Sequence, residues 1–109
     1  MVSNNSCVAV ETYLDIHDLR AFIDVVSARA SADVTLLKPS PFLVAEAIGR
    51  LDVAASQSVL VGESTTDVQA AHAASVRVSG YANRPAKIPS LDAHEPDVIT
   101  TSMDLFAYL

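Results

Sequence analysis

Apolar residues occur along this chain in two alternating patterns: short continuous runs, and longer stretches with helical spacing. The runs at Phe22–Val26, Ser58–Gly62, Val76–Ser79 and Val98–Thr100 are rich in β-branched residues. Runs of this length and composition predict β-strands. Because the run at Ser58–Gly62 has no polar residue in its centre, we expect it to be buried on both faces of a sheet.

The stretches between these runs carry the start signals of helices. Ser6 fits the N-cap of a first helix over Cys7–Ile16. A second helix is expected to run to about Leu51, with Ser40 as its N-cap and Pro41 at its first position. Further helical segments are expected at residues 67–74 and 90–93, and from Met103 with Ser102 as the cap.

Strands that alternate with helices predict an α/β fold. We expect a three-layer, Rossmann-like parallel sheet flanked by helices, in one domain that covers residues 1–109. In such sheets the ligand site lies beyond the carboxyl ends of the strands. The turn that follows Gly62 is therefore the first place to look for chemistry.

Composition narrows the classes of partner. Half of the residues are hydrophobic, and seven Lys and Arg stand against thirteen Asp and Glu, which gives a net charge of −6. This acidic balance argues against nucleic acid and against an anionic membrane surface as main partners. A single cysteine, Cys7, excludes an internal disulfide, and a reducing, cytoplasmic location fits best. No apolar run reaches the roughly 20 residues that a membrane span needs.

The turn after Gly62 combines acids with hydroxyls at the expected start of a helix. Glu63 and Asp67 supply two carboxylates, and three hydroxyl residues lie between them. Free N–H groups at a helix start favour an anion, whereas carboxylates favour a hard cation, so a divalent metal that bridges to a phosphate is one interpretation. The other is that Asp67 and its neighbours only cap the helix.

Two more polar segments are candidates for phosphate binding. Lys38 lies just before the expected second helix and could present its ammonium group to an anion, although most lysines are solvated surface charges. The segment Ser3-Asn4-Asn5 precedes the first helix and offers hydroxyl and amide groups, although such a segment is more often an ordinary cap. The sequence has neither a Gly-x-x-x-x-Gly-Lys phosphate loop nor a Gly-x-Gly-x-x-Gly fingerprint.

Taken in order, these segments resemble the motifs of the haloacid dehalogenase superfamily, in its phosphoglycolate phosphatase-like branch. Ser3, within Val-Ser-Asn-Asn, is similar to the second motif, and Lys38, within Lys-Pro-Ser-Pro, is similar to the third. Residues Gly62–Asp67, followed by an alanine-rich helix, resemble the fourth motif, and Gly80–Lys87 resembles the loop after the next strand. The resemblance covers essentially the whole chain.

This resemblance implies roles for individual residues. Ser3 and Asn4 would bind the phosphoryl group, and Lys38 would balance its charge. Glu63 and Asp67 would hold Mg²⁺, and the substrate would be a small phosphorylated molecule. Since the family has Asp where this chain has Glu63, and Mg²⁺ demands near-ideal octahedral geometry, we expect metal binding to be weakened.

The family's opening motif, Asp-x-Asp-x-(Thr or Val), is absent from the sequence, and so is the cap that selects substrates. In the family the first Asp of that motif attacks phosphorus. We therefore expect an incomplete core domain that hydrolyses phosphate esters negligibly as this chain. The main interpretation is the carboxyl-terminal part of an Mg²⁺-dependent phosphatase. The alternatives are a natural pseudoenzyme that binds phosphate or a protein, and an unrelated parallel α/β domain of the receiver type.

The same absence affects the expected sheet. In the family the first strand lies at the centre of the sheet and pairs with the strand that corresponds to Ser58–Gly62. Without it, that strand has an unpaired apolar edge, and such edges invite another chain. We therefore expect self-association through this edge.

Overall fold

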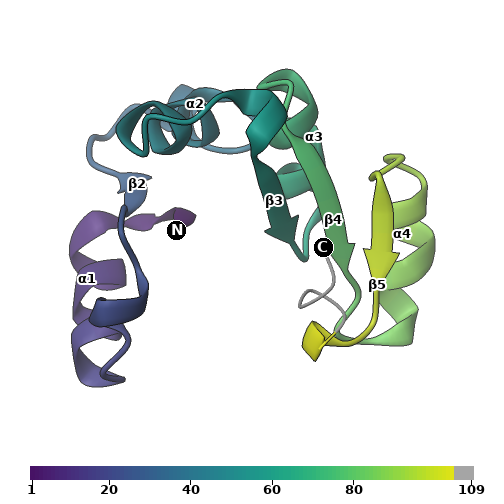
Figure 1. Ribbon diagram of the computed structural model, residues 1–109, viewed down its shortest axis with the longest axis horizontal. Coiled ribbons are helices and arrows are strands. Elements are labelled where there is room, and N and C mark those ends of the chain that lie inside the picture. Colours follow the sequence, from purple (N-terminus) through teal and green to yellow (C-terminus); the bar gives the residue numbers. More distant parts are fainter. Residues whose placement is uncertain (105–109) are drawn as a thin grey trace.

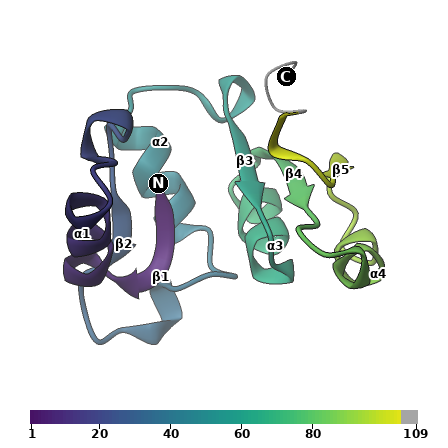
Figure 2. The same ribbon diagram turned by 90° about the horizontal axis from the view of Figure 1, so that it is seen from below.

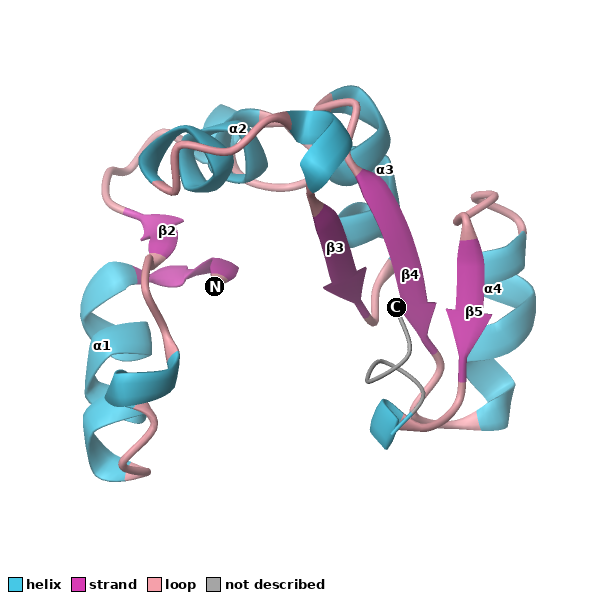
Figure 3. Ribbon diagram, in the orientation of Figure 1, coloured by secondary structure: helices cyan, strands magenta, loops and turns pink. Residues whose placement is uncertain are grey.

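The computed structural model describes residues 1–104, and in this range the strands form two separate parallel sheets (Figures 1 and 3). Strand β1 (Val2–Ser6) pairs with β2 (Ser27–Arg29). The second sheet has the order β3 (Val59–Gly62), β4 (Arg77–Tyr81) and β5 (Val98–Thr100). The parallel α/β class is therefore confirmed, with the sheet in two parts.

Four α-helices connect and cover these strands: α1 (Cys7–Ile16), α2 (Phe42–Arg50), α3 (Thr65–Ala73) and α4 (Ile88–Asp92). Helix α1 packs on the two-stranded sheet, and α3 and α4 pack on the three-stranded sheet (Figure 1). Helix α2 contacts β1 and β2 as well as α3, so it joins the two parts. Within residues 1–104, no helix has the length and apolar character needed to cross a membrane.

The apolar core has two clusters that follow the two sheets. The smaller cluster lies between α1 and the first sheet and consists of Val10, Leu14, Val26 and Ala28. The larger cluster lies between the second sheet and its helices, and consists of Val44, Val68, Ala70, Ala71, Val76, Val78, Ala82 and Leu91. Since Val44 comes from α2, that helix contributes directly to the larger cluster.

Local signals in the sequence place several element boundaries correctly. The first helix is Cys7–Ile16 as expected, and the Ser6 hydroxyl caps it by accepting the N–H of Ala9 at 3.2 Å. The Ser40 hydroxyl accepts the N–H of Phe42 at 3.3 Å, but the helix begins at Phe42, one residue later than the expected start at Pro41. The last strand has the expected bounds, and the helix expected from Met103 lies mostly outside the described residues.

The strand expected at Phe22–Val26 is wrong. Residues Arg20–Phe22 form a short 3-10 turn, and the strand is Ser27–Arg29, further along the chain. Pairing decides this position, because the N–H of Ser27 donates to the carbonyl oxygen of Met1 at 2.8 Å and sets the register with β1. The apolar run itself supplies Val26 to the core rather than a strand.

The expectation that the Ser58–Gly62 strand is buried on both faces is also wrong. Val59 and Val61 are 47% and 40% exposed, whereas Leu60 packs against the larger core cluster. No described helix covers the face that carries the two valines, since α3 and α4 lie on the other side of this sheet (Figure 1). The continuous apolar run at Ser58–Gly62 therefore forms a strand that is covered on one face only.

We predict that Leu14→Ala lowers the free energy of unfolding by about 2–5 kcal/mol, the range for leucine deletions in cores. Leu14 is 1% exposed at the centre of the smaller cluster, so its loss leaves a cavity. Ile16→Ala in the same helix is the control, because Ile16 is 72% exposed and its removal should cost about 0.5 kcal/mol or less. Urea denaturation measures both, and equal effects would contradict the packing of α1 on the first sheet.

Candidate functional site

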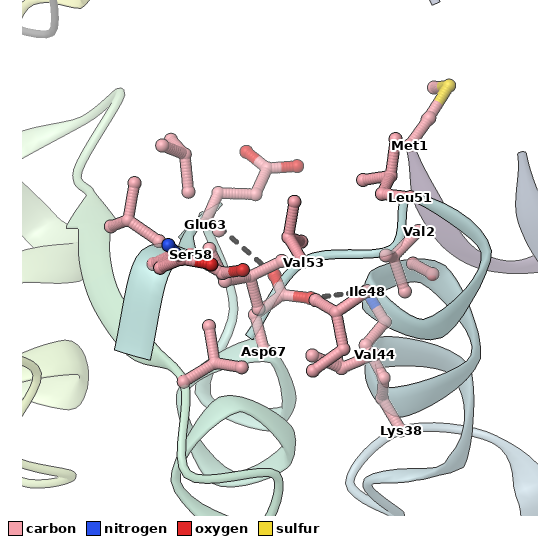
Figure 4. A pocket seen from close by; sticks show the side chains of 17 residues that line it. Met1, Val2, Lys38, Val44, Ile48, Leu51, Val53, Ser58, Glu63 and Asp67 are labelled. Atoms are coloured by element: carbon pink, nitrogen blue, oxygen red, sulfur yellow. Dashed lines mark hydrogen bonds and ion pairs between the residues drawn. The ribbon is translucent and has the colours of Figure 1, made fainter. Parts of the chain in front are cut away.

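The predicted site residues Lys38 and Asp67 meet in an ion pair. The Nζ atom of Lys38 donates to Oδ1 of Asp67, and only about a tenth of each side chain is exposed (11% and 10%). Lys38 lies just before α2, and Asp67 lies in the first turn of α3. The pair therefore ties together segments that belong to the two parts of the fold (Figure 4).

The second carboxylate oxygen of Asp67 is held by the turn that follows β3. Its Oδ2 atom accepts the N–H of Glu63 at 3.1 Å, the N–H of Ser64 at 3.0 Å and the hydroxyl of Ser64 at 2.8 Å. Ser64 in turn accepts the N–H of Asp67, which completes a capping box at the start of α3. The helix-capping role of Asp67 and its ion pair are thus present together.

These contacts decide the ionisation of Asp67. Burial by itself raises the pKa of this carboxyl group, because it disfavours the charged form. The hydrogen bonds from Lys38 and Ser64 and the charge of Lys38 act in the opposite direction and outweigh burial. The pKa of Asp67 therefore lies below its ordinary value, and the side chain is a carboxylate at neutral pH.

Asn4 fixes the backbone of Lys38 rather than offering its side chain to the cavity. Its Nδ2 atom donates to the carbonyl oxygen of Lys38 at 3.1 Å, and its Oδ1 atom accepts the N–H of Lys38 at 2.8 Å. The hydroxyl of Ser3 accepts the N–H of Asn5 at 3.1 Å, and none of the described contacts joins Ser3 to Lys38 or Asp67. The structure thus brings Asn4, Lys38 and Asp67 together and leaves Ser3 beside them on β1.

Glu63 has a partner that the sequence reasoning missed. Its Oε2 atom accepts from Nζ of Lys87 at 2.9 Å, in a pair whose side chains are 57% and 35% exposed. Lys87 lies in the loop between β4 and α4, 24 residues further along the chain. The only signal for Lys87 in the sequence was its position after the strand β4. Because β4 runs parallel to β3, the loop after β4 lies at the same edge of the sheet as the turn after β3.

Lys38, Glu63 and Asp67 line a cavity of about 780 Å³ that lies between the two sheets (Figure 4). The rest of the lining is mainly aliphatic and comes from Met1 and Val2, from α2 and the loop that follows it, and from β3. The charged side chains therefore gather at the edge where β3 ends. A cavity of this size with a few convergent polar groups is typical of a ligand site.

The described residues do not by themselves fit a magnesium ion. No group of three or more His, Cys, Asp or Glu side chains in residues 1–104 is placed to hold a metal. Both acids expected to bind Mg²⁺ are also engaged, Glu63 with Lys87 and Asp67 with Lys38 and Ser64. An ion that needs several oxygen ligands would require further donors and a rearrangement of these pairs.

Comparison with known proteins identifies the family. Residues 1–81 match the sequence model of the haloacid dehalogenase-like hydrolases. The chain belongs to this family. A search of curated proteins finds no match to the chain. Three of the segments that carry the resemblance lie within the matched part, namely those at Ser3, Lys38 and Gly62–Asp67.

Solved structures of haloacid dehalogenase-like proteins superpose on the chain. A protein of unknown function from Agrobacterium tumefaciens is 21% identical with a TM-score of 0.85, over 96% of this chain and 50% of that protein. A hydrolase from Ehrlichia chaffeensis is 26% identical with a TM-score of 0.66, over 73% and 38%. CbbY from Rhodobacter sphaeroides, in complex with xylulose-(1,5)bisphosphate, is 30% identical with a TM-score of 0.51, over 58% and 27%. The chain thus spans half or less of each relative.

We predict that Gly62→Ala disrupts the turn that holds Asp67. A Cβ atom at Gly62 would overlap Cβ of Asp67 and stand 2.7 Å from its Cγ atom, so the helix start must shift. The expected loss of unfolding free energy is about 1–3 kcal/mol, the cost of overpacking. Gly49→Ala is the control: nothing lies within 4 Å of its added Cβ atom, and it should stabilise α2 by up to about 1 kcal/mol. Equal effects in thermal denaturation would contradict this account.

We predict that Asp67→Asn lowers stability by up to about 3 kcal/mol, because it leaves the Lys38 ammonium buried without a counter-charge. The pKa of Asp67 is lowered in the folded state, so its contribution is complete above about pH 4 and is lost as the pH falls through the folded pKa. The difference in unfolding free energy between wild type and variant should therefore shrink on acidification. Urea denaturation from pH 7 to pH 3 measures it, and a constant difference would contradict the ion pair.

Proposed function

We propose that this chain forms the phosphate-binding part of a haloacid dehalogenase-like phosphatase that acts on small phosphate esters in its full-length form. The observation that carries the proposal is the position of Lys38, which lines the cavity beside the end of β3 while Asn4 fixes its backbone. The complex of CbbY with a sugar bisphosphate supports the substrate class by likeness. A fixed ammonium group in a partly aliphatic cavity is well suited to a phosphoryl oxygen.

The residues of the site would divide the work of binding. Lys38 would donate to a phosphoryl oxygen while keeping part of its contact with Asp67. Ser3 stays a proposed phosphate ligand, but its hydroxyl accepts the N–H of Asn5 and the residue does not line the cavity. Asn4 would act by holding Lys38 in place, since both of its polar atoms already bond that residue. Binding in the cavity thus relies mainly on one cation, Lys38.

Hydrolysis requires a nucleophile, and among residues 1–104 none stands free in the cavity to attack phosphorus. The only acids that line the cavity among the described residues are Glu63 and Asp67. Asp67 is held by four hydrogen bonds and cannot approach phosphorus without losing them. Glu63 and Asp67 stay the proposed magnesium ligands, with further donors needed from outside this set. We therefore expect negligible turnover by these 109 residues.

A natural pseudoenzyme is the second candidate, and the pairing of charges favours it. Each acid of the site is neutralised by a lysine of the same chain, Asp67 by Lys38 and Glu63 by Lys87. Such a site can hold a phosphate group or a protein partner without chemistry. In either case the expected reducing, cytoplasmic location, which rests on the single free Cys7, stays a prediction.

We predict that inorganic phosphate at about ten times its Kd raises the Tm of the pure chain by about 5 °C, because it binds only the folded state. Lys38→Met should abolish this shift, whereas Lys87→Met should keep it, since Lys87 does not line the cavity. Thermal denaturation with and without phosphate measures both.

The same protein should not hydrolyse p-nitrophenyl phosphate, with or without Mg²⁺. An unchanged phosphate shift in Lys38→Met would overturn the binding site. Metal-dependent turnover by the pure chain would instead overturn the claim that it lacks a nucleophile.

A further inference from the structure

Glu63 is the more exposed of the two acids of the site, and a cation of the same chain already holds its carboxylate. Its Oε2 atom accepts from Nζ of Lys87 at 2.9 Å. Because Glu63 lines the cavity, the ammonium group of Lys87 lies within hydrogen-bonding distance of a carboxylate at the cavity edge. An ion that bound Glu63 would therefore have to compete with Lys87.

The fold holds Lys87 at this edge. Lys87 ends the 3-10 turn Pro85–Lys87, its N–H donates to the carbonyl oxygen of Arg84 at 3.0 Å, and its own carbonyl oxygen accepts the hydroxyl of Ser90 at 2.9 Å. Helices α3 and α4 are neighbours on one face of the second sheet, so the turns that precede them lie at the same edge (Figure 2). Backbone contacts thus set the position from which Lys87 reaches Glu63.

The length of the Glu63 side chain suits this contact. The carboxylate of glutamate lies one carbon–carbon bond, about 1.5 Å, further from the backbone than that of aspartate, which the family resemblance implies at this position. In this structure the carboxylate reaches the loop between β4 and α4, while the N–H of Glu63 stays on Oδ2 of Asp67. Glutamate at position 63 therefore comes with an internal partner.

Asp67 has little remaining capacity to bind an ion. Each oxygen of a carboxylate offers about two lone pairs. Oδ2 of Asp67 already accepts from three donors, supplied by Glu63 and Ser64, and Oδ1 accepts from Nζ of Lys38. Since Mg²⁺ requires an octahedral set of oxygen ligands, Asp67 cannot compensate for a carboxylate that Lys87 occupies.

The charges of the site already balance. Two ammonium groups, of Lys38 and Lys87, face two carboxylates, of Asp67 and Glu63, in two ion pairs. A divalent ion at Glu63 would lie beside the ammonium group of Lys87, and its double charge would double the repulsion that a single charge experiences there. The site is therefore electrically neutral without an added cation.

We propose that Lys87 takes the place of a divalent cation at Glu63, so that this chain binds phosphate at Lys38 without a metal. The proposal rests on the proposed phosphate binding and specifies how that site works. Lys87 is a positioning residue in this account, because it acts through Glu63 and does not line the cavity. The role proposed above for Glu63 as a magnesium ligand then requires the pair with Lys87 to be broken.

The first test measures the affinity of the full 109-residue chain for inorganic phosphate by isothermal titration calorimetry. One titration contains excess EDTA, and the other contains excess Mg²⁺. Because the anion contacts Lys38 and no divalent ion contributes, the two dissociation constants should agree within about twofold. The same comparison in Lys87→Met shows whether freeing Glu63 makes phosphate binding sensitive to Mg²⁺.

The second test measures binding of Mn²⁺ alone, from the electron paramagnetic resonance signal of the free ion. Lys87→Met frees Glu63 and should bind Mn²⁺ about tenfold more tightly than the wild type, which corresponds to about 1.4 kcal/mol. Arg77→Met is the matched control, because it removes the same charge at the opposite end of β4, and it should change the affinity less than about twofold. Lys87→Arg keeps a cation beside Glu63 and should bind Mn²⁺ as the wild type does.

The gain in Lys87→Met should also depend on Glu63. Adding Glu63→Gln to Lys87→Met should return the affinity for Mn²⁺ to that of the wild type. An exposed ion pair contributes little to stability, so all of these variants should fold, and circular dichroism with urea denaturation verifies it.

Three results would overturn the proposal. Loss of phosphate binding in EDTA would show that the site needs a metal. Equal gains in Mn²⁺ affinity for Lys87→Met and Arg77→Met, or no gain in either, would show that Lys87 does not keep a cation from Glu63. A gain that survives Glu63→Gln would place the ion elsewhere. Absence of phosphate binding under every condition would instead overturn the proposed function, while the Mn²⁺ titrations would still decide the role of Lys87.

Discussion

The buried ion pair between Lys38 and Asp67 is the constraint on which the rest of this structure depends. It joins the segment before α2 to the start of α3, and so connects two sheets that share no backbone hydrogen bonds in the described part of the chain. A buried pair of charges is stable only when its remaining polar atoms are satisfied. The turn after β3 meets this condition, because it surrounds the second oxygen of Asp67 with three donors. Packing, capping and electrostatics therefore converge on a single carboxylate.

The part of the fold that local signals determine could be predicted from the sequence. The cap at Ser6 fixed the first helix, and the short run Val98–Thr100 fixed the last strand, because both depend on neighbouring residues. The strand after the first helix was misplaced because pairing with β1, a long-range contact, chooses Ser27–Arg29 over the more apolar run before it. The exposure of Val59 and Val61 was missed for a similar reason, since an apolar run does not reveal whether anything covers it.

The site shows the same division between local and long-range information. Lys38 and Asp67 were each predicted as site residues, but their ion pair was not, because it joins segments 29 residues apart that follow strands of different sheets. The role of Asn4 was also missed, because a side chain expected to face a ligand instead bonds the backbone of Lys38. The parallel strands β3 and β4 bring the loop that carries Lys87 to the edge that carries Glu63, but no spacing in the sequence encodes which residue of that loop reaches Glu63.

The ion pair and the cavity are physically linked, because Lys38 and Asp67 both line it. The remaining walls of the cavity are mainly aliphatic, and a low local dielectric strengthens the interaction of Lys38 with any nearby negative charge. The division of the sheet into two parts is therefore more than a structural gap, because the electrostatics of the charged edge depend on what fills the cavity between the two sheets.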